Sequence, residues 1–402
     1  MDKTKIQDLS SRIKKELEGN IIPFWSTKAV DEKNGGFIGS MTNDGVINPR
    51  ASKGLVLNTR ILWSFSSFYG FYKKPEYLTL AKREYDDLME HFWDKDFGGM
   101  FWLVDFQGKP QESRKQIYGN SFAIYALAEY YRVTGEKESL AKAMEIFDLF
   151  EKHAWDSQYG GYFESYDRDW KKAAAQQLTS GDQAAAKSMN TSLHAIEAIA
   201  NLYDVNKDKL VGRRLEQMLN IYADYILHPY NSYSQLFFDA NWYPKSEIVS
   251  FGHDIESAWL MQRDAEILGE ERVLGKMKRM AVNLAESVYD FGLDNKKSMF
   301  YEADNNNNVR NKEKHWWVQA EAVVGYLNAY ELTGREEYFN AAYDIWDFIE
   351  NNIVDKKGGE WFWKVDAQGK VDRGSMKVSE WKCPYHNGRA CIEIIQRLGK
   401  IV

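Results

Sequence analysis

The sequence predicts an all-α protein, an (α/α)6 barrel with short β-hairpins in the loops at one mouth. A hairpin motif recurs six times along the 402 residues, and two helical segments lie between successive copies. One segment of each pair is amphipathic, whereas the other is apolar on most sides. Twelve such helices can close into a ring with the apolar set inside, although an open solenoid is the alternative. Because the repeats span the chain, we expect residues 1–402 to form a single domain.

The hairpin motif is clearest in four places. Each copy has an acidic residue, a Gly-Gly step, an apolar run with aromatics and then a turn, which is typical of a short hairpin leaving a helix. The copies are DEKNGGFIGSMTNDG from residue 31, DKDFGGMFWLVDFQG from 94, DSQYGGYFESYDRDW from 156 and DKKGGEWFWKVDAQG from 355. Weaker copies begin near residues 230 and 289, which makes six.

The helical segments between the hairpins fall into two sets. Leu140, Ala143, Met144 and Phe147 follow the i, i+3, i+4, i+7 spacing of a helix with one solvated face. The stretches YGNSFAIYALAEYY from residue 118 and VQAEAVVGYLNAYELTG from 318 are small and apolar all round, as expected of enclosed helices. The connectors VTGEKE from 133 and LTGREE from 332 join an inner helix to an outer one.

Composition and charge exclude several classes of partner. The net charge is −7 and basic residues are scattered among acids, so the chain lacks the footprint of a nucleic-acid binder. The N-terminal segment has no apolar signal core, and no stretch is long enough to span a bilayer, so a cytoplasmic protein without membrane contact is expected. We expect a monomer or a weak homodimer with a small, neutral or weakly polar ligand.

The two cysteines offer neither a disulfide nor a metal site. Cys383 and Cys391 are eight apart in one predicted helix, about 12 Å at 1.5 Å per residue, which is beyond disulfide reach. A structural zinc needs three or four ligands at tight spacing, which the histidines and cysteines do not provide. No metal is expected.

Polar and aromatic residues converge at the predicted starts of the inner helices, which face the mouth. Three of the seven histidines lie there, within reach of a substrate at the mouth, which a general base requires. Fourteen tryptophans add flat faces suited to packing and to sugar rings. The residues at these starts are Arg60, Tyr118, Asn190, His194, His253, Glu256, Trp316, Trp317, Glu321 and His386.

Two of the histidines are predicted near helix N-termini. Ser250 as an N-cap puts His253 at the third helical position, and Pro384 at the first position puts His386 at the third. The positive end of the helix dipole disfavours a second proton, so each ring is expected to be neutral near pH 7. Glu256 shares the face of His253 and is expected to orient that ring or to pair with Arg60. A di-iron site is the rival interpretation, but it requires the pattern twice and two further glutamates, and we find no second copy of the pattern in the chain.

The chain resembles the N-acylglucosamine 2-epimerase superfamily over essentially its whole length. The segments that carry the resemblance are PFWS, NGGF, LNTRILWSFS, MNTSLHAIEA, SFGHDIESAWL, HWWVQAEA and EWKCPYHNGRACIE. The last two are the most specific. The segment containing Trp381 and His386 is similar to the branch that acts on disaccharides rather than to the N-acetylhexosamine branch.

The resemblance implies an (α/α)6 barrel that inverts C2 of the reducing-end glucose of β-1,4-linked disaccharides without a cofactor. Cellobiose would become glucosyl-mannose, and lactose would become epilactose. His253 and His386 match the acid/base pair, and we group His194 with them. Further residues match groups that bind the sugar, tune the site or wall it with aromatic rings: Arg60, Asn190, Glu256, Glu321, Tyr118, Trp316 or Trp317, and Trp381.

The chemistry of C2 inversion agrees with the residues at the helix starts. The ring opens, a proton alpha to the aldehyde is removed, and a proton returns to the opposite face of a planar enediolate. Two bases with a pKa near 7 on opposite sides can do this, since each can both accept and donate a proton. Arg60 is expected to stabilise charge on the oxygen at C1.

Three alternatives are weighed against this function. An inverting hydrolase needs two opposed carboxylates, but Asp254 and Glu256 are two residues apart on one helix. An aldose-ketose isomerase, or a 2-epimerase of mannose or N-acylglucosamine, would use the same enediolate, and Trp381 as a platform for a second sugar favours the disaccharide. A sugar-binding scaffold would not need the histidines.

Overall fold

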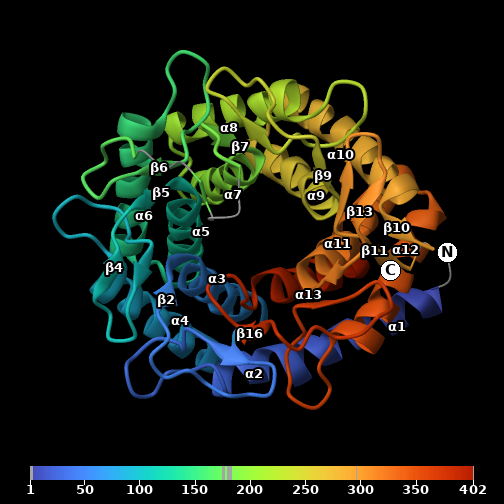
Figure 1. Ribbon diagram of the computed structural model, residues 1–402, viewed down its shortest axis with the longest axis horizontal. Coiled ribbons are helices and arrows are strands. Elements are labelled where there is room, and N and C mark those ends of the chain that lie inside the picture. Colours follow the sequence, from blue (N-terminus) through green and yellow to red (C-terminus); the bar gives the residue numbers. More distant parts are fainter. Residues whose placement is uncertain (1–2, 174–176, 179–182, 296, 402) are drawn as a thin grey trace.

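The helices of the protein close into a two-layered ring (Figure 1) in the computed structural model, which describes residues 3–173, 177–178, 183–295 and 297–401. Each inner helix packs against the next, and the last packs against the first, which closes the ring. The predicted (α/α)6 barrel is therefore confirmed, and the open solenoid is wrong. The inner helices are α3 (Leu55–Tyr72), α5 (Ile117–Thr134), α7 (Met189–Asn206), α9 (Phe251–Leu268), α11 (Trp316–Thr333) and α13 (Tyr385–Ile401).

The outer helices are more amphipathic, and most of them end in a wider, π-helical turn. They are α1 (Lys3–Glu16) continued by η1 (Leu17–Ile21) and α2 (Ile22–Thr27), α4 (Pro75–Asp87) with η2 (Leu88–Phe92), α6 (Lys137–Leu149) with η3 (Phe150–Ala154), α8 (Lys209–Ile221) with η4 (Tyr222–Ile226), α10 (Glu271–Phe291), and α12 (Glu336–Phe348) with η5 (Ile349–Ile353). The inner helices α5 and α11 end at Gly135 and Gly334 with positive φ, which confirms the two predicted connectors.

Short strands link neighbouring repeats at one end of the ring. The strand before each inner helix pairs with a strand of another repeat, and β1 at the N-terminal end pairs with β16 near the C-terminus. All these pairs are antiparallel: β2–β3, β5–β6, β7–β8, β9–β12, β14–β15 and β1–β16. The strands are β1 (Met41–Thr42), β2 (Lys53–Gly54), β3 (Leu103–Val104), β4 (Pro110–Glu112), β5 (Lys115–Gln116), β6 (Ser165–Tyr166), β7 (Lys187–Ser188), β8 (Phe237–Phe238), β9 (Ile248–Ser250), β10 (Leu293–Asp294), β11 (Ser298–Met299), β12 (Glu302–Asp304), β13 (Val309–Asn311), β14 (Lys314–His315), β15 (Lys364–Val365) and β16 (Met376–Val378).

A buried lysine in these strands ties most inner helices to the hairpin of the preceding repeat. Lys187 Nζ lies 2.7 Å from Asp156 Oδ2, and neither side chain is more than 8 % exposed. Val249 takes the lysine position before α9, and His228 takes the aspartate position in its hairpin. Among the described residues, the pairs are Lys53–Asp31, Lys115–Asp94, Lys187–Asp156, Lys314–Asp294 and Lys377–Asp355.

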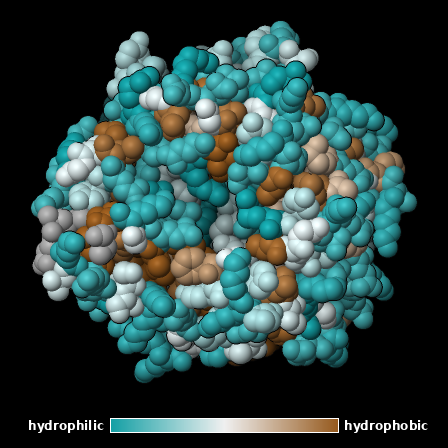
Figure 2. All heavy atoms as spheres, turned by 180° about the vertical axis from the view of Figure 1, so that it is seen from behind, coloured by the Kyte–Doolittle hydropathy of each residue, from teal (hydrophilic) through white to brown (hydrophobic). Residues whose placement is uncertain are grey.

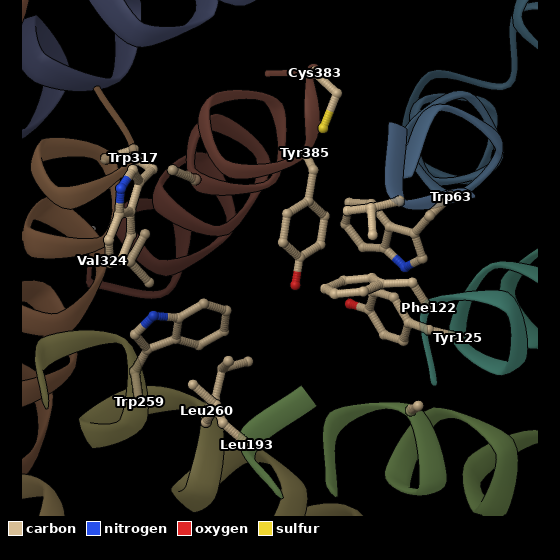
Figure 3. Packing of buried hydrophobic residues seen from close by; sticks show 14 of the residues in the cluster. Trp63, Phe122, Tyr125, Leu193, Trp259, Leu260, Trp317, Val324, Cys383 and Tyr385 are labelled. Atoms are coloured by element: carbon tan, nitrogen blue, oxygen red, sulfur yellow. The ribbon is translucent and has the colours of Figure 1, made fainter. Parts of the chain in front are cut away.

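Aromatic side chains of the inner helices fill much of the barrel interior. Figure 3 shows Trp63, Phe122, Tyr125 and Tyr385 gathered together there, and the Trp63 and Tyr125 rings stack with centroids 5.1 Å apart. Seen from behind, the molecule is mostly hydrophilic on its surface and is hollowed near its centre (Figure 2). No helix among the described residues has the length and apolarity that crossing a membrane requires.

The two cysteines are free and buried. Only Cys391 lies in α13, because the helix begins at Tyr385, so the prediction that both cysteines share one helix was wrong.

Candidate active site

A cavity of about 580 Å³ opens where the inner helices begin. This volume is in the range of small-molecule binding sites. Every predicted site residue lines it except Glu321, which lies fully buried behind His386. The predicted residues that line it are Arg60, Tyr118, Asn190, His194, His253, Glu256, Trp316, Trp317, Trp381 and His386.

The register of the inner helices explains why these residues meet. Residues four apart share a helix face, so the second and sixth positions of an inner helix point the same way. In α11 these positions hold Trp317 and Glu321, and in α7 they hold Asn190 and His194. The backbone N–H of Gly388 donates to Pro384, so α13 begins at Tyr385 and His386 is its second residue. The prediction that His386 is at the third position was therefore wrong by one residue.

The His386 ring is held from behind by a carboxylate. Its Nδ1 lies 2.7 Å from Glu321 Oε1. The other oxygen of Glu321 accepts a hydrogen bond of 3.0 Å from Trp259 Nε1, and the Arg389 guanidinium donates to Oε1 at 2.6 Å. With donors from Arg389 and Trp259 on its two oxygens, Glu321 acts as an acceptor, so this contact puts the imidazole hydrogen on Nδ1 and leaves Nε2 with a lone pair.

His194 has a similar arrangement one turn from its own carboxylate. Its Nδ1 lies 2.9 Å from Glu197 Oε2, and Tyr385 donates its hydroxyl to Glu197 at 2.7 Å. Arg389 Nη1 also donates to Glu197, at 2.5 Å. One guanidinium therefore joins the carboxylates that hold two of the three histidines.

His253 is held differently from the prediction. Its Nδ1 lies 2.8 Å from the hydroxyl of Ser250, and Glu256 bonds Arg389 at 2.8 Å instead. The expectation that Glu256 orients His253 was wrong, because the carboxylate points toward α13. It lies 3.8 Å from Nδ1 of His386.

Trp317 contacts both candidate acid/base histidines. Its ring centroid is 4.8 Å from that of His253 and 5.5 Å from that of His386. A Cβ at Gly252 would lie 2.6 Å from the Trp317 ring, so the glycine allows the indole to approach α9. Trp316 instead packs on Trp363, with centroids 4.5 Å apart. Both tryptophans line the cavity, but Trp317 is the one beside the histidines.

Burial sets the protonation of the three histidines. It lowers the pKa of His253 to about 3, with His194 and Arg60 adding to the effect and Glu321 opposing it. Burial also lowers the pKa of His194 and His386, and Arg60 and Arg389 lower both further. His253 and His386 are neutral near pH 7 as predicted, but their pKa lies well below the expected value near 7.

The acidic residues of the site divide into two kinds. Burial would raise the pKa of Glu197, but Arg389 and the hydrogen bond from His194 outweigh it, so that pKa is lowered. Burial and the nearby Glu321 raise the pKa of Glu256 to about 8, although Arg389 opposes them. At neutral pH, Glu197 is ionised whereas Glu256 is largely protonated.

Glu256 and Glu321 are also the groups that a metal site would use. Glu256, Glu321 and His386 place ligand atoms within 4.8 Å of one another. Arg389 Nη2 lies between the two carboxyl groups, 2.8 Å and 2.6 Å from their oxygens, so a guanidinium already occupies the position of a cation there. The prediction also overlooked a second His-x-x-Glu pattern, because His194 and Glu197 repeat the spacing of His253 and Glu256.

Arg60 faces the cavity from α3 without pairing with Glu256. Its Nη2 donates to the Tyr118 hydroxyl at 2.9 Å, and its guanidinium lies 4.2 Å from the Phe122 ring centroid. The predicted ion pair with Glu256 is therefore wrong. Among the described residues, Asn190 Oδ1 is buried without a hydrogen-bond partner at the cavity wall.

Aromatic rings form the outer wall. Trp381 lies 5.9 Å from Tyr118 and 6.0 Å from Trp102, measured between ring centroids. Trp363 and Tyr301 line the cavity as well and were not predicted. Sequence patterns gave no reason to prefer them among the many aromatic residues of the hairpins.

Arg389, Glu197 and Tyr385 are the principal residues that the prediction missed. The repeated His-x-Ile-Glu spacing at 194–197 and 253–256 is the signal that could have identified Glu197. Arg389 and Tyr385 lie one turn apart at the start of α13. The first turns of the other inner helices face the cavity. The same reasoning applied to α13 could have identified both residues.

Comparison with known proteins gives concordant results. The model of the N-acylglucosamine 2-epimerase (GlcNAc 2-epimerase) family matches residues 36–389. A cellobiose 2-epimerase of Bacteroides fragilis is 39 % identical over 387 residues, 96 % of this chain and 98 % of that protein. One of Ruminococcus albus is 38 % identical over 391 residues, 96 % of this chain and 98 % of that protein. The structure of cellobiose 2-epimerase from Bacillus thermoamylovorans B4167 superposes with a TM-score of 0.93 at 34 % identity, covering 97 % of this chain and all of that one.

Proposed function

The chain belongs to the N-acylglucosamine 2-epimerase family, and we propose that it is an isomerase that inverts C2 of the reducing-end glucose in β-1,4-linked disaccharides. Cellobiose would give glucosyl-mannose, and lactose would give epilactose. The observation that carries the proposal is the pair of imidazoles, His253 and His386, which line one cavity beside Trp317, each with Nδ1 engaged. Each therefore has Nε2 available for the substrate.

In this mechanism the sugar ring opens first, and the aldehyde makes the hydrogen on C2 acidic. One imidazole Nε2 removes that hydrogen as a proton, and the electron pair moves into the planar enediolate. The other histidine, which takes up a solvent proton on Nε2 when the substrate binds, delivers that proton to the opposite face of C2, and the aldehyde re-forms. After one turnover the two rings have exchanged protonation states, and exchange with water restores them.

The charges around the site support this chemistry. The enediolate is an anion, and its formation beside both rings raises their proton affinity from the low values of the free protein. Arg60, which donates to Tyr118 at the cavity wall, supplies a positive charge for the oxygen at C1. The aromatic wall around Trp381 favours a second sugar ring beyond the reacting one.

An NMR time course of cellobiose in deuterium oxide with metal-free protein tests the proposal. We expect a disaccharide with mannose at the reducing end and one deuterium at C2. Release of glucose would instead indicate hydrolysis, and a ketose labelled at C1 would indicate an aldose-ketose isomerase. Unchanged cellobiose would contradict the proposed activity.

A further inference from the structure

The serine that begins α9 does not act as an ordinary helix cap. Ser188, at the same position before α7, accepts a hydrogen bond of 3.1 Å from the backbone N–H of Thr191. Ser250 has the extended backbone of an N-cap residue, but its side chain accepts no backbone hydrogen bond. Its hydroxyl lies instead 2.8 Å from Nδ1 of His253. The start of α9 thus uses its capping hydroxyl for a histidine side chain.

The partner of His253 differs in kind from the partners of the other two histidines. His194 and His386 place Nδ1 against the carboxylates Glu197 and Glu321. A carboxylate only accepts hydrogen bonds and stabilises a charged imidazole, whereas a hydroxyl can also donate and adds no charge. Within the described parts of the chain, Nε2 of each of these three rings has no hydrogen-bond partner.

The strand β9, which leads into α9, also carries no charged side chain. Val249 replaces the lysine that precedes the other inner helices, and it is fully buried. The strand β9 is held by three backbone-paired residues of β12 instead. Consequently, no side chain of β9 adds a fixed charge beside the His253 ring. The charged or titratable groups that act on it come from other inner helices: His194, Glu321 and Arg60.

We propose that Ser250 is a positioning residue that accepts a hydrogen bond from Nδ1 of His253 and so presents a lone pair on Nε2 to the substrate, without adding charge. The inference rests on the proposed function. When Nε2 takes the C2 proton, the Nδ1–H bond to Ser250 persists, so the ring keeps its orientation. Because a neutral hydroxyl does not stabilise the imidazolium as a carboxylate would, His253 remains a ready proton donor for the reverse reaction.

Three variants of the full chain separate positioning from helix stability. Ser250→Ala removes the hydroxyl, and Ser250→Thr keeps it. Asp208→Ala is the matched control, because Asp208 is a true N-cap of α8 that accepts from the backbone of Leu210 and Val211, at 2.8 Å and 3.1 Å, away from the cavity. Each variant is assayed with cellobiose for kcat and KM, and its Tm is measured.

We expect Ser250→Ala to lower kcat by on the order of tenfold to a hundredfold, since general base catalysis contributes ~10²–10⁴. KM should change little, because the hydroxyl acts through the histidine. Ser250→Thr should restore most of kcat, and Asp208→Ala should lower Tm while leaving kcat unchanged. A wild-type kcat in Ser250→Ala, or a Ser250→Thr variant as slow as Ser250→Ala, would overturn the inference.

Imidazole nitrogen NMR of the wild-type protein tests the tautomer without any variant or turnover. The His253 ring, assigned by its loss in His253→Asn, should carry hydrogen on Nδ1 and a lone pair on Nε2. Hydrogen on Nε2 would overturn the inference even if the protein epimerises cellobiose. A wild-type protein that does not epimerise cellobiose, yet shows the expected tautomer, would contradict only the proposed function.

Discussion

Arg389 is the residue on which the arrangement of the site depends most. It is buried, and it donates to Glu197, Glu256 and Glu321, which come from three different inner helices. Only a planar fork can reach all three carboxylates at once. Two of these carboxylates hold histidines, so the guanidinium determines both the charge and the position of the groups behind the sugar.

Replacing Arg389 with lysine keeps the charge but removes the fork. We expect the free energy of unfolding to fall by about 2 kcal/mol, since each lost hydrogen bond to a charged group costs ~1.5–3 kcal/mol. The kcat should fall with it, because Glu321 would no longer be fixed behind His386. Urea denaturation and steady-state kinetics measure both effects.

Arg132→Lys is the matched control for that variant. Arg132 also bonds two carboxylates, Glu129 and Asp204, but its side chain is 34 % exposed. Ion pairs of this kind contribute ~0–1 kcal/mol. Equal losses of stability in the two variants would show that burial of the Arg389 cluster has no special effect.

Trp381 separates disaccharides from monosaccharides in this account. Its ring lies on the outer wall near Tyr118 and Trp102, beyond the histidines. We expect Trp381→Ala to lower kcat/KM for cellobiose about tenfold, since a well-placed aromatic contact contributes ~0.5–1.5 kcal/mol. Turnover of glucose or mannose should fall much less. Equal losses on both kinds of sugar would contradict the role of Trp381 as a platform.

Much of the site could be predicted at the scale of single residues, but its hydrogen bonds could not. The positions of Arg60, His194 and His253 follow from helix period and repeat register alone. The partner of each histidine does not, because Glu256 could reach either His253 on its own helix or Arg389 on another. Which contact forms depends on the packing angle between helices, and that is not encoded in local spacing.

Among the secondary-structure elements, the strand before each inner helix acts as a clamp between repeats. Lys187 and Asp156 illustrate it, since both side chains are nearly inaccessible to water. Burial lowers the pKa of Lys187, and the hydrogen bond to Asp156 opposes this. Removing one partner of such a pair leaves an uncompensated charge in a medium of low polarity.

We expect Lys187→Met to lower the free energy of unfolding by about 3 kcal/mol, as for other broken buried pairs. Adding Asp156→Asn should recover part of that loss, because the unpaired charge is then gone. Lys82→Met is the control, since the Lys82–Asp86 pair on α4 is 64 % and 55 % exposed and should matter little. If the double variant is less stable than Lys187→Met alone, the clamp does not act through charge.

The elements themselves were largely predictable, whereas their connections were not. The Gly-Gly hairpins and the alternating helices were evident from turn residues and period. The π-helical turns at the ends of five outer helical segments were not predicted, because one extra residue in a helical turn leaves no compositional trace. The buried Lys–Asp pairs between repeats were also missed, since the two residues of each pair are separated by 20 or more residues.

At the scale of the whole molecule, many buried titratable groups make stability depend on pH. Burial raises the pKa of Asp254 to about 7 and that of Asp264 and Glu256 to about 8. In the unfolded chain these acids titrate near pH 4, so between about pH 4 and pH 8 the folded state binds more protons and stability falls as pH rises. The buried histidines have lowered pKa values and act oppositely, but only below about pH 6.5.

We therefore expect the free energy of unfolding to fall between pH 6.5 and pH 8. Asp264→Asn should flatten this decline, because one proton contributes up to about 1.4 kcal/mol per pH unit. Both oxygens of Asp264 lack hydrogen-bond partners among the described residues, so the amide should not remove a contact. Asp86→Asn, on the exposed face of α4, is the control. A slope that Asp264→Asn leaves unchanged would contradict the assignment.

Closure of the ring brings together residues that are far apart in the chain. The strand β1 meets β16, and α3 meets α13, so Arg60 and His386 share one cavity although more than 300 residues separate them. Repeat counting predicted this closure, since six units of two helices suit a ring. The shape of the cavity could not be predicted, because it depends on aromatic side chains from several hairpins.

The central claim is that His253 and His386 act on opposite faces of C2, and solvent exchange in single variants tests it most directly. His253→Asn and His386→Asn are each incubated in deuterium oxide with cellobiose and, separately, with glucosyl-mannose. We predict that neither variant epimerises, and that each exchanges the C2 hydrogen of one epimer only, with opposite preferences. Exchange of the same epimer by both variants, or epimerisation by either, would contradict the claim.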